Sequence, residues 1–227
     1  MKYIGLITVR SRSSRLKKKF LLNFGKFRVI EHIIKRCLVN KITPIVCTTK
    51  NTEDNIIINI AKELKVDFFR GSEKNKIKRW HDCAKKFQIK YFHTIDADDP
   101  FFDPKSIKRS LNLCRKSYDI VYPSKVSKEG GGSEGYSFSV KSIKSIYKNL
   151  FKFKININYL DTEMIDPFII SNKFKKTILK GPKYEIKRAR LTLDYKEDYK
   201  MLCKIVKAKG NFSSREEINN FLKKNKY

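Results

Sequence analysis

The chain of 227 residues fits one domain, or one domain with a small appendage, and its 41% hydrophobic content is enough for a packed core. The 52 Lys and Arg residues against 23 Asp and Glu residues give a net charge of +29, a balance typical of proteins with nucleic-acid or anionic-membrane partners. A transmembrane helix and a signal peptide are not expected, because no run of about 18 apolar residues exists and the first apolar run is short and followed by charges.

Strand and helix patterns alternate along the first half of the chain. Short apolar runs predict strands at Lys2–Val9, Thr43–Cys47, Val66–Phe69, Tyr91–Ile95 and Asp119–Tyr122. Apolar residues at helical spacing predict helices at Val29–Asn40, Glu53–Leu64, Asn75–Phe87 and Pro104–Lys116. Thr52 is the expected N-cap of the second helix. The alternation predicts an α/β fold of three layers, in which a mostly parallel sheet carries helices on both faces.

Beyond residue 123 the alternation is weaker. SKVSKEGGGSEG is expected to be a flexible loop, because three consecutive glycines suit neither a helix nor the interior of a strand. Residues 151–172 show no clean periodicity, and we expect a small arm or dimerisation element within about 151–180. A late strand is predicted at Arg188–Leu193, followed by helices at Tyr195–Lys207 and Ser214–Lys224. The whole chain, 1–227, is interpreted as one domain.

The cysteines and histidines indicate neither a disulfide framework nor a metal centre. The five cysteines are odd in number and none has CxxC spacing, which is typical of reduced thiols in a cytoplasmic protein. His32, His81 and His93 share no metal-ligand spacing, and we interpret them as single structural residues.

The loop after the first strand is long and basic. TVRSRSSRLKKKFL, residues 8–21, carries six positive charges in a connection of roughly 19 residues, against the usual two to six. Sites in parallel sheets form where strands end, so Arg10, Arg15 and Lys19, with the hydroxyls of Ser13 and Ser14, are candidates for a triphosphate cradle. The alternative is a solvated basic loop, and neither GxxxxGK[ST] nor GxGxxG is present.

Carboxylates follow two other predicted strands. DADDP, residues 96–100, ends the fourth strand, and RLTLD ends the late one at Asp194. A hard divalent cation would explain such clustering, since Mg²⁺ takes one or two carboxylates together with phosphate oxygens and water. Asp98 is the first candidate ligand, and Asp194 joins it if the late strand lies in the same sheet. Asp103 is instead interpreted as a cap for the helix at Pro104.

These segments together resemble the signatures of the sugar-acid cytidylyltransferases, particularly the spore-coat polysaccharide type, a family that includes 3-deoxy-octulosonate and acylneuraminate cytidylyltransferases. The first loop is similar to ARxxSxRLPGKxL, with matches at Arg10, Ser13, Arg15, Leu16, Lys19 and Leu21. FFRGSEKNKIKRW resembles FRGSEDDVLARY, with matches at Arg70, Gly71, Ser72, Glu73 and Arg79.

Further similarities follow in the same order along nearly the whole chain. GKFRVIEHIIKR resembles GKPLIEHVIER, CTTKNTEDN resembles ATT-x-x-x-x-DD, and TIDADDPFFDP resembles RITADDPLIDP. Later, GGGSEGYSF is similar to GLDVEVFSF at Glu134, TEMIDPFI to REHVTPYI at Glu163, and RLTLDYKED to RLTVDTPED at Asp194. Each motif is weak by itself, but eight in one order make a specific resemblance.

The resemblance implies a nucleotidyltransferase fold of Rossmann-like type, the co-substrate CTP, the cofactor Mg²⁺ and, frequently, a homodimer. Its site residues would be Arg10, Ser13, Arg15, Lys19, Thr48, Gly71, Ser72 and Arg79 for the nucleotide, Asp98 and Asp194 for the metal, and Glu134 and Glu163 for the acceptor or the partner subunit. Arg10, Lys19 and Asp98 would carry catalysis by positioning and charge neutralisation. The expected reaction joins CMP to an acidic sugar or related acid and releases pyrophosphate, in cytoplasmic steps of surface-glycan biosynthesis.

Four departures from the signatures bear on the acceptor and the first loop. Lys17 and Lys18 replace Pro-Gly, Asp96 stands where relatives carry Thr or Gln, Asn75 replaces an acidic residue, and Met164 takes the place of a common His. They leave open a phosphonate or other small phosphorylated acceptor, and also an inactive relative. A basic nucleic-acid-binding protein is a further alternative, disfavoured because few aromatic residues interleave the basic stretches and no helix-turn-helix or zinc pattern is present.

Overall fold

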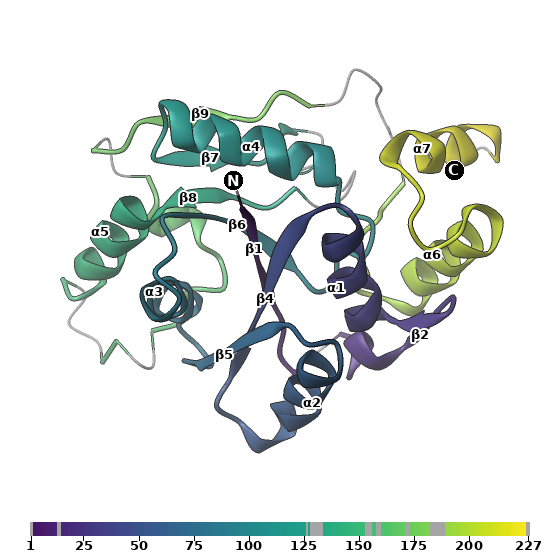
Figure 1. Cartoon of the computed structure of the whole chain (residues 1–227), viewed down its shortest axis with the longest axis horizontal. Coiled ribbons are helices and arrows are strands. Elements are labelled where there is room, and N and C mark those ends of the chain that lie inside the picture. The colour runs from purple at the N-terminus through teal and green to yellow at the C-terminus, as the bar shows by residue number, and fades with distance from the viewer. Residues whose placement is uncertain are drawn as a thin grey trace.

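The computed structural model describes residues 2–12, 15–125, 127, 134–152, 156–157, 160–170, 173–181 and 189–225. Its main strands are β1 (Tyr3–Thr8), β4 (Ile42–Thr49), β5 (Asp67–Gly71), β6 (Tyr91–Asp96), β7 (Ile120–Tyr122), β8 (Ser137–Ser139) and β9 (Lys176–Ile178). They form one seven-stranded sheet in the order β5-β4-β1-β6-β8-β7-β9 (Figure 1). Only β8 runs antiparallel to its neighbours in this sheet, so the prediction of a mostly parallel sheet is confirmed.

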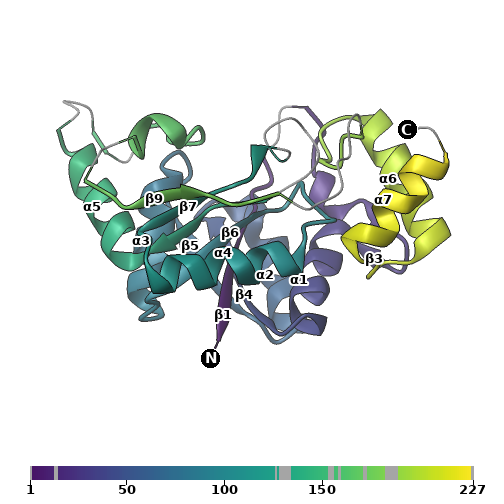
Figure 2. The same ribbon diagram turned by 90° about the horizontal axis from the view of Figure 1, so that it is seen from above.

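Helices cover both faces of the sheet, as the three-layer prediction requires (Figures 1 and 2). One face packs against α1 (Val29–Val39), α2 (Asn55–Glu63) and α4 (Pro104–Lys116), and α6 (Lys196–Lys209) and α7 (Arg215–Lys224) lie to the side of α1 and share the same core (Figure 1). The other face packs against α3 (Lys76–Lys86) and α5 (Val140–Leu150). Within the described part of the chain, no helix is long and apolar enough to cross a membrane.

Local side-chain chemistry explains several helix starts. Asp103 accepts hydrogen bonds from the backbone N–H groups of Lys105 and Ser106, so its predicted role as the cap of α4 is confirmed. Thr52 is not the N-cap of α2, contrary to prediction, because it lies inside a 3₁₀ turn, Thr52–Asp54, that precedes the helix. Ser214 caps α7 and accepts from the backbone of Glu217.

The late strand predicted at Arg188–Leu193 is wrong for the described residues 189–193, which form no strand. This segment reaches the end of β6 as a single extended connection, and the backbone N–H of Leu193 donates to the carbonyl of Asp98 at 2.6 Å. Its alternating apolar residues, Ala189, Leu191 and Leu193, are buried in the core around α1 and α6, which explains why the pattern resembles a strand.

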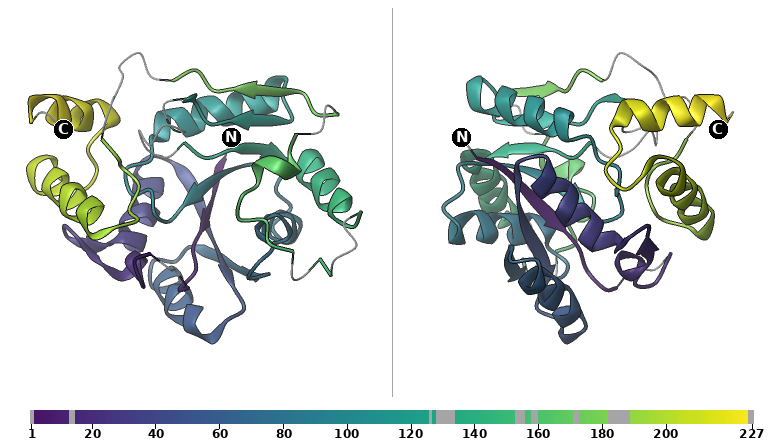
Figure 3. Two further views of the ribbon diagram at one scale, coloured as in Figure 1. Left: turned by 180° about the vertical axis from the view of Figure 1, so that it is seen from behind. Right: turned by 45° about the vertical axis from the view of Figure 1, so that its right-hand side comes forward.

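The basic first loop is tied to the C-terminal helices through a small hairpin of β2 (Asn23–Phe24) and β3 (Phe27–Arg28), seen beside α6 and α7 in Figure 3. Gly25 at the hairpin turn has φ +64°, and a Cβ there would lie 2.5 Å from side-chain atoms of both Asn211 and Val206. Asn211 also donates to the carbonyl of Phe24 at 2.7 Å. The hairpin therefore anchors one end of the loop to α6 and the turn that follows it.

The segment expected to form an arm is described only in part. Residues 160–170 fold back onto α3, where the Thr162 hydroxyl accepts from the backbone N–H of Ile77 at 3.1 Å. Ile165 and Ile169 are buried in the core beneath α3 and α5, whereas Met164 is largely exposed. The dimerisation role of this segment stays a prediction, and the triple-glycine stretch lies outside the described residues.

Candidate active site

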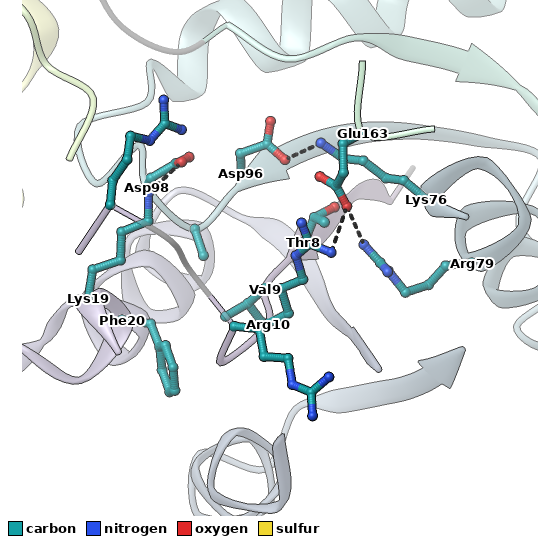
Figure 4. A pocket seen from close by; sticks show the side chains of 13 residues that line it. Thr8, Val9, Arg10, Lys19, Phe20, Lys76, Arg79, Asp96, Asp98 and Glu163 are labelled. Atoms are coloured by element: carbon teal, nitrogen blue, oxygen red, sulfur yellow. Dashed lines mark hydrogen bonds and ion pairs between the residues drawn. The ribbon is translucent and has the colours of Figure 1, made fainter. Parts of the chain in front are cut away.

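A cavity of about 320 Å³ opens where the first loop, the start of α3 and the end of β6 meet (Figure 4). Six of the residues predicted for the site line it: Arg10, Arg15, Lys19, Arg79, Asp98 and Glu163. Three of them come from the first loop, and the other three come from α3, the loop after β6 and the returning segment 160–170. The fold thus brings together residues as far apart in the sequence as Arg10 and Glu163.

Lys19 joins the two carboxylates that the sequence proposes as metal ligands. Its Nζ lies 2.8 Å from Oδ2 of Asp98 and 3.0 Å from Oδ1 of Asp194. Arg15 approaches the same oxygen of Asp194 at 3.1 Å. Burial opposes the charged form of Asp194, yet Lys19, Arg15 and Arg190 together hold the pKa of this carboxyl below its ordinary value. Asp194 is therefore ionised at neutral pH.

Backbone hydrogen bonds explain why Asp194 faces Asp98 without a strand between them. The bond between Leu193 and the Asp98 carbonyl fixes the extended segment against the end of β6. The backbone N–H of Asp194 then donates to Asp198, which also accepts from Tyr195 at the start of α6. The start of α6 therefore holds Asp194 in place.

The residues present fit a magnesium ion that also binds substrate. Asp98 and Asp194 converge on a single cation, the ammonium of Lys19, so both carboxylates can reach one point. The described residues contain no group of three or more His, Cys, Asp or Glu side chains placed to share a metal. Two carboxylates without a further protein ligand match the preference of Mg²⁺ for substrate phosphates and water.

The opposite end of the cavity is formed by Arg79, Arg10 and Glu163. Arg79 is fully buried, and its Nη1 donates to the backbone carbonyls of Ser72 at 2.6 Å and Glu73 at 3.1 Å. Its Nε and Nη2 find no hydrogen-bond acceptor within the described part of the structure, although Nη2 lies 3.9 Å from Glu163. Arg10 approaches the same Glu163 oxygen at 3.5 Å. Buried unpaired donors facing a cavity are typical of a site that receives a polar ligand.

Three predicted nucleotide-binding residues do not line this cavity. The Thr48 hydroxyl is buried and donates to Asp54 at 3.0 Å. Gly71 and Ser72 line a neighbouring cavity of about 470 Å³ instead. Glycine is required at position 71, because a Cβ there would lie 2.9 Å from Cγ of Arg79 and would push the Arg79 side chain out of place. The nucleotide role of these three residues stays a prediction.

The remaining predicted residues lie elsewhere or outside the described chain. Glu134 lines a second, smaller cavity of about 120 Å³ and accepts from the Ser106 hydroxyl at 3.0 Å and the Ser124 backbone at 2.8 Å. Ser13 is outside the described residues. His32 and His93 are buried, and burial lowers the pKa of each to about 3.

Lys76 and Asp96 form an ion pair in the cavity wall that the sequence analysis did not assign to the site. Lys76 Nζ lies 3.0 Å from Oδ1 of Asp96, as Figure 4 shows. Burial disfavours the ammonium, but Asp96 and Glu163 outweigh it and raise the pKa of Lys76. The sequence contained a signal for this ion pair. Lys76 is the first residue of α3, and a cation at a helix N-terminus is unfavourable unless an anion lies beside it.

Asp54 fastens the start of the basic loop to the sheet. Its carboxylate accepts from the backbone N–H of Ser11 at 2.7 Å and from Thr48 and Thr49, so the hydrogen bonds hold its pKa below the ordinary value although burial opposes this. We expect Asp54→Asn to lower the free energy of unfolding by about 2 kcal/mol at pH 7, because an amide nitrogen cannot accept these bonds.

The Asp54 effect should depend on pH. A lowered folded-state pKa stabilises the fold above about pH 4, the ordinary value, and this stabilisation is lost as the pH falls through the folded-state value. Urea unfolding of wild type and variant at pH 7 and pH 3 measures the difference, with the exposed neighbour change Glu53→Gln as control. Equal stability of wild type and Asp54→Asn at pH 7 would contradict the anchoring role.

Sequence comparisons give a consistent family. A family model described as cytidylyltransferase matches residues 4–163. Over 214 residues the chain is 32% identical to an uncharacterized protein of Methanocaldococcus jannaschii, a match that covers 91% of this chain and 84% of that protein. A 3-deoxy-manno-octulosonate cytidylyltransferase of Rickettsia canadensis is 31% identical over 132 residues, which are 55% of this chain and 53% of that enzyme.

Solved structures give the same fold. A cytidylyltransferase from Leptospira borgpetersenii superposes with a TM-score of 0.84 at 22% identity, covering 100% of this chain and 96% of that one. A CMP:2-keto-3-deoxy-manno-octonic acid synthetase, complexed with CTP, gives a TM-score of 0.65 at 12% identity over 92% of this chain and 99% of that one. The α/β architecture described above is therefore that of known nucleotidyltransferases.

Proposed function

Because this chain belongs to the cytidylyltransferase family, we propose that it transfers CMP from CTP to an acidic sugar or related acid and releases pyrophosphate. The main observation behind the proposal is that the two ends of the cavity differ in chemistry. Asp98 and Lys19 line one end, with the buried Asp194 paired to Lys19 behind them, and the unpaired donors of Arg79 lie at the other. A nucleoside triphosphate has matching ends, a charged phosphate chain and a polar planar base.

Each side chain has a role in this reaction. The acceptor oxygen attacks the α-phosphorus of CTP in line, the bond to the β-phosphate oxygen breaks, and pyrophosphate leaves on the opposite side. Arg15 and Lys19 neutralise the β- and γ-phosphates and the leaving pyrophosphate, and Arg10 adds positive charge from the Glu163 end of the cavity. Arg79 donates to the carbonyl of the base. Asp98 and Asp194 would hold Mg²⁺, which when bound screens phosphate charge and orients the α-phosphate.

The acceptor is proposed from the relatives. The Rickettsia canadensis enzyme is named for 3-deoxy-manno-octulosonate, a sugar acid, and its similarity to this chain supports an acid of this kind as acceptor. A homodimer working in the cytoplasm on surface glycans belongs to the same proposal.

The proposal is tested by pyrophosphate release with each of the four ribonucleoside triphosphates and Mg²⁺. The acceptors are 3-deoxy-octulosonate, N-acetylneuraminate and 2-hydroxyethylphosphonate, so that sugar acids and a phosphonate are compared directly. We expect release with CTP and at least one acid, and at least about tenfold less with the other nucleotides. Equal rates with all four nucleotides, or tight salt-dependent binding of duplex DNA without any turnover, would contradict the proposal.

A further inference from the structure

The Lys76–Asp96 pair lies midway between the two ends of the nucleotide cavity (Figure 4). Lys76 stands where the motif FRGSEDDVLARY has valine, and Asp96 stands where RITADDPLIDP has threonine. Two uncharged positions of the resembling signatures are thus replaced here by opposite charges that meet at 3.0 Å. The pair therefore places two opposite charges in the wall of the nucleotide cavity.

The two partners differ in exposure. The Lys76 side chain is 10% exposed, whereas that of Asp96 is 43% exposed. A buried ammonium group without an anionic partner is strongly destabilising, whereas an exposed carboxylate loses little free energy when its side chain rotates into solvent. The ammonium has three N–H donors, and Asp96 is the ion-pair partner that the described residues provide within 4 Å. An incoming anion can therefore replace Asp96 at Lys76.

Asp96 also lies between the nucleotide cavity and the second cavity, because it lines both. The second cavity is walled by polar groups that include Thr94, Glu134, Tyr136 and Thr192. The hydroxyls can exchange hydrogen bonds with the hydroxyl groups of a ligand, and the Glu134 carboxylate can accept from such groups but repels a second anion. Asp96 is the lining residue that the two cavities share, so a ligand that contacted both would lie against it.

We propose that Lys76 binds the acid group of the acceptor in exchange for Asp96, and that the acceptor's hydroxyl groups extend into the second cavity. The inference rests on the proposed function and deepens it, since it names the side chain that selects an acid. The anionic group would lie at Lys76, and the hydroxylated part would be directed toward Glu134, because the Tyr136 hydroxyl already donates to Asp166.

The kinetic test uses Lys76→Met, which keeps the length of the side chain and removes its charge. We expect the KM for the acid acceptor to rise about 10- to 100-fold, the loss of one charge-assisted contact, with the KM for CTP changed less than about threefold. Lys76→Arg should recover most of the acceptor affinity. Lys85→Met, an exposed lysine on the same helix, is the matched control and should leave both constants unchanged.

A binding test works without turnover, because Trp80 is the sole tryptophan and its ring centre lies 5.3 Å from Lys76 Nζ. Tryptophan fluorescence is titrated with 3-deoxy-octulosonate, N-acetylneuraminate and 2-hydroxyethylphosphonate, with mannose as the uncharged control. We expect a saturable change with a sugar acid, weaker binding of the phosphonate, and about 10- to 100-fold weaker binding of the acid by Lys76→Met.

The outcomes separate the inference from the proposed function. Equal affinity of wild type and Lys76→Met for the acids, or no saturable response of wild type to any of the three, overturns the inference even where CTP is consumed. Binding that is tightest for mannose overturns it as well. Absence of pyrophosphate release with every nucleotide and acid overturns the proposed function, whatever the fluorescence shows.

Discussion

Replacement of Asp98 by asparagine is expected to reduce CTP-dependent turnover by about three orders of magnitude while the fold stays intact. The substitution keeps the shape of the side chain and removes one of the two carboxylate charges that converge at Lys19. The backbone carbonyl of Asp98 still accepts from Leu193, so the local structure should be retained. Pyrophosphate release and thermal unfolding, measured on the same preparation, check both parts of the expectation.

The matched control for this change is Asp103→Asn. Asp103 lies in the same loop but caps α4, and asparagine caps a helix as well as aspartate does. Its turnover should stay within a few-fold of wild type. Near-wild-type pyrophosphate release by Asp98→Asn would show that Asp98 holds no metal. The assignment of Asp194 as a metal ligand would then lose its support, because it depends on both carboxylates binding one ion.

Lys19→Met is expected to reduce turnover by about 100- to 1,000-fold, because the ammonium that neutralises the departing pyrophosphate is removed. It should also lower the free energy of unfolding by about 2 kcal/mol at pH 7, since Asp98 and Asp194 would then face one another without the cation between them. Addition of Mg²⁺ should recover part of this stability, because the ion would serve both carboxylates.

The control for Lys19→Met is Lys17→Met in the same loop, an exposed lysine to which no role is assigned. Turnover and thermal unfolding are measured with and without Mg²⁺ for both variants. A Lys19→Met protein that keeps wild-type turnover, or whose melting temperature does not respond to Mg²⁺, would contradict the arrangement of one cation between two carboxylates.

The sheet and most helices were predictable because their apolar periodicity is strong. Most of the elements that were missed are short strands with weak local signals, but helix α5 was also missed, although its buried residues Ile143, Ile146 and Leu150 recur at helical spacing. Strand β8 is only Ser137–Ser139, and it is recognisable as a strand only by its pairing with β6 and β7. In contrast, Ala189–Leu193 has a strand-like pattern but is a connection, because its apolar residues are buried by helices rather than by neighbouring strands. Tertiary context decides both cases.

The sequence indicated residues that line the cavity where charges follow the ends of strands, as at Arg15, Lys19 and Asp98, and their roles stay predictions. The candidate site was not predictable where a polar residue serves the fold. Thr48 lies at the functional end of β4, yet its hydroxyl is used by Asp54. Lys76 shows the reverse, since a lysine on a charged helix resembles a solvated one until the structure places it beside Asp96. Burial, which a single sequence does not give, separates the two cases.

The most direct test of nucleotidyl transfer follows the two halves of CTP with separate labels. Wild type is incubated with Mg²⁺, an acid acceptor and CTP that carries ³²P at either the α- or the γ-phosphate. The account predicts that α-label appears in a CMP–acceptor product and that γ-label appears in an equal amount of pyrophosphate. Release of γ-label as inorganic phosphate, or of α-label as free CMP independent of the acceptor, would contradict it.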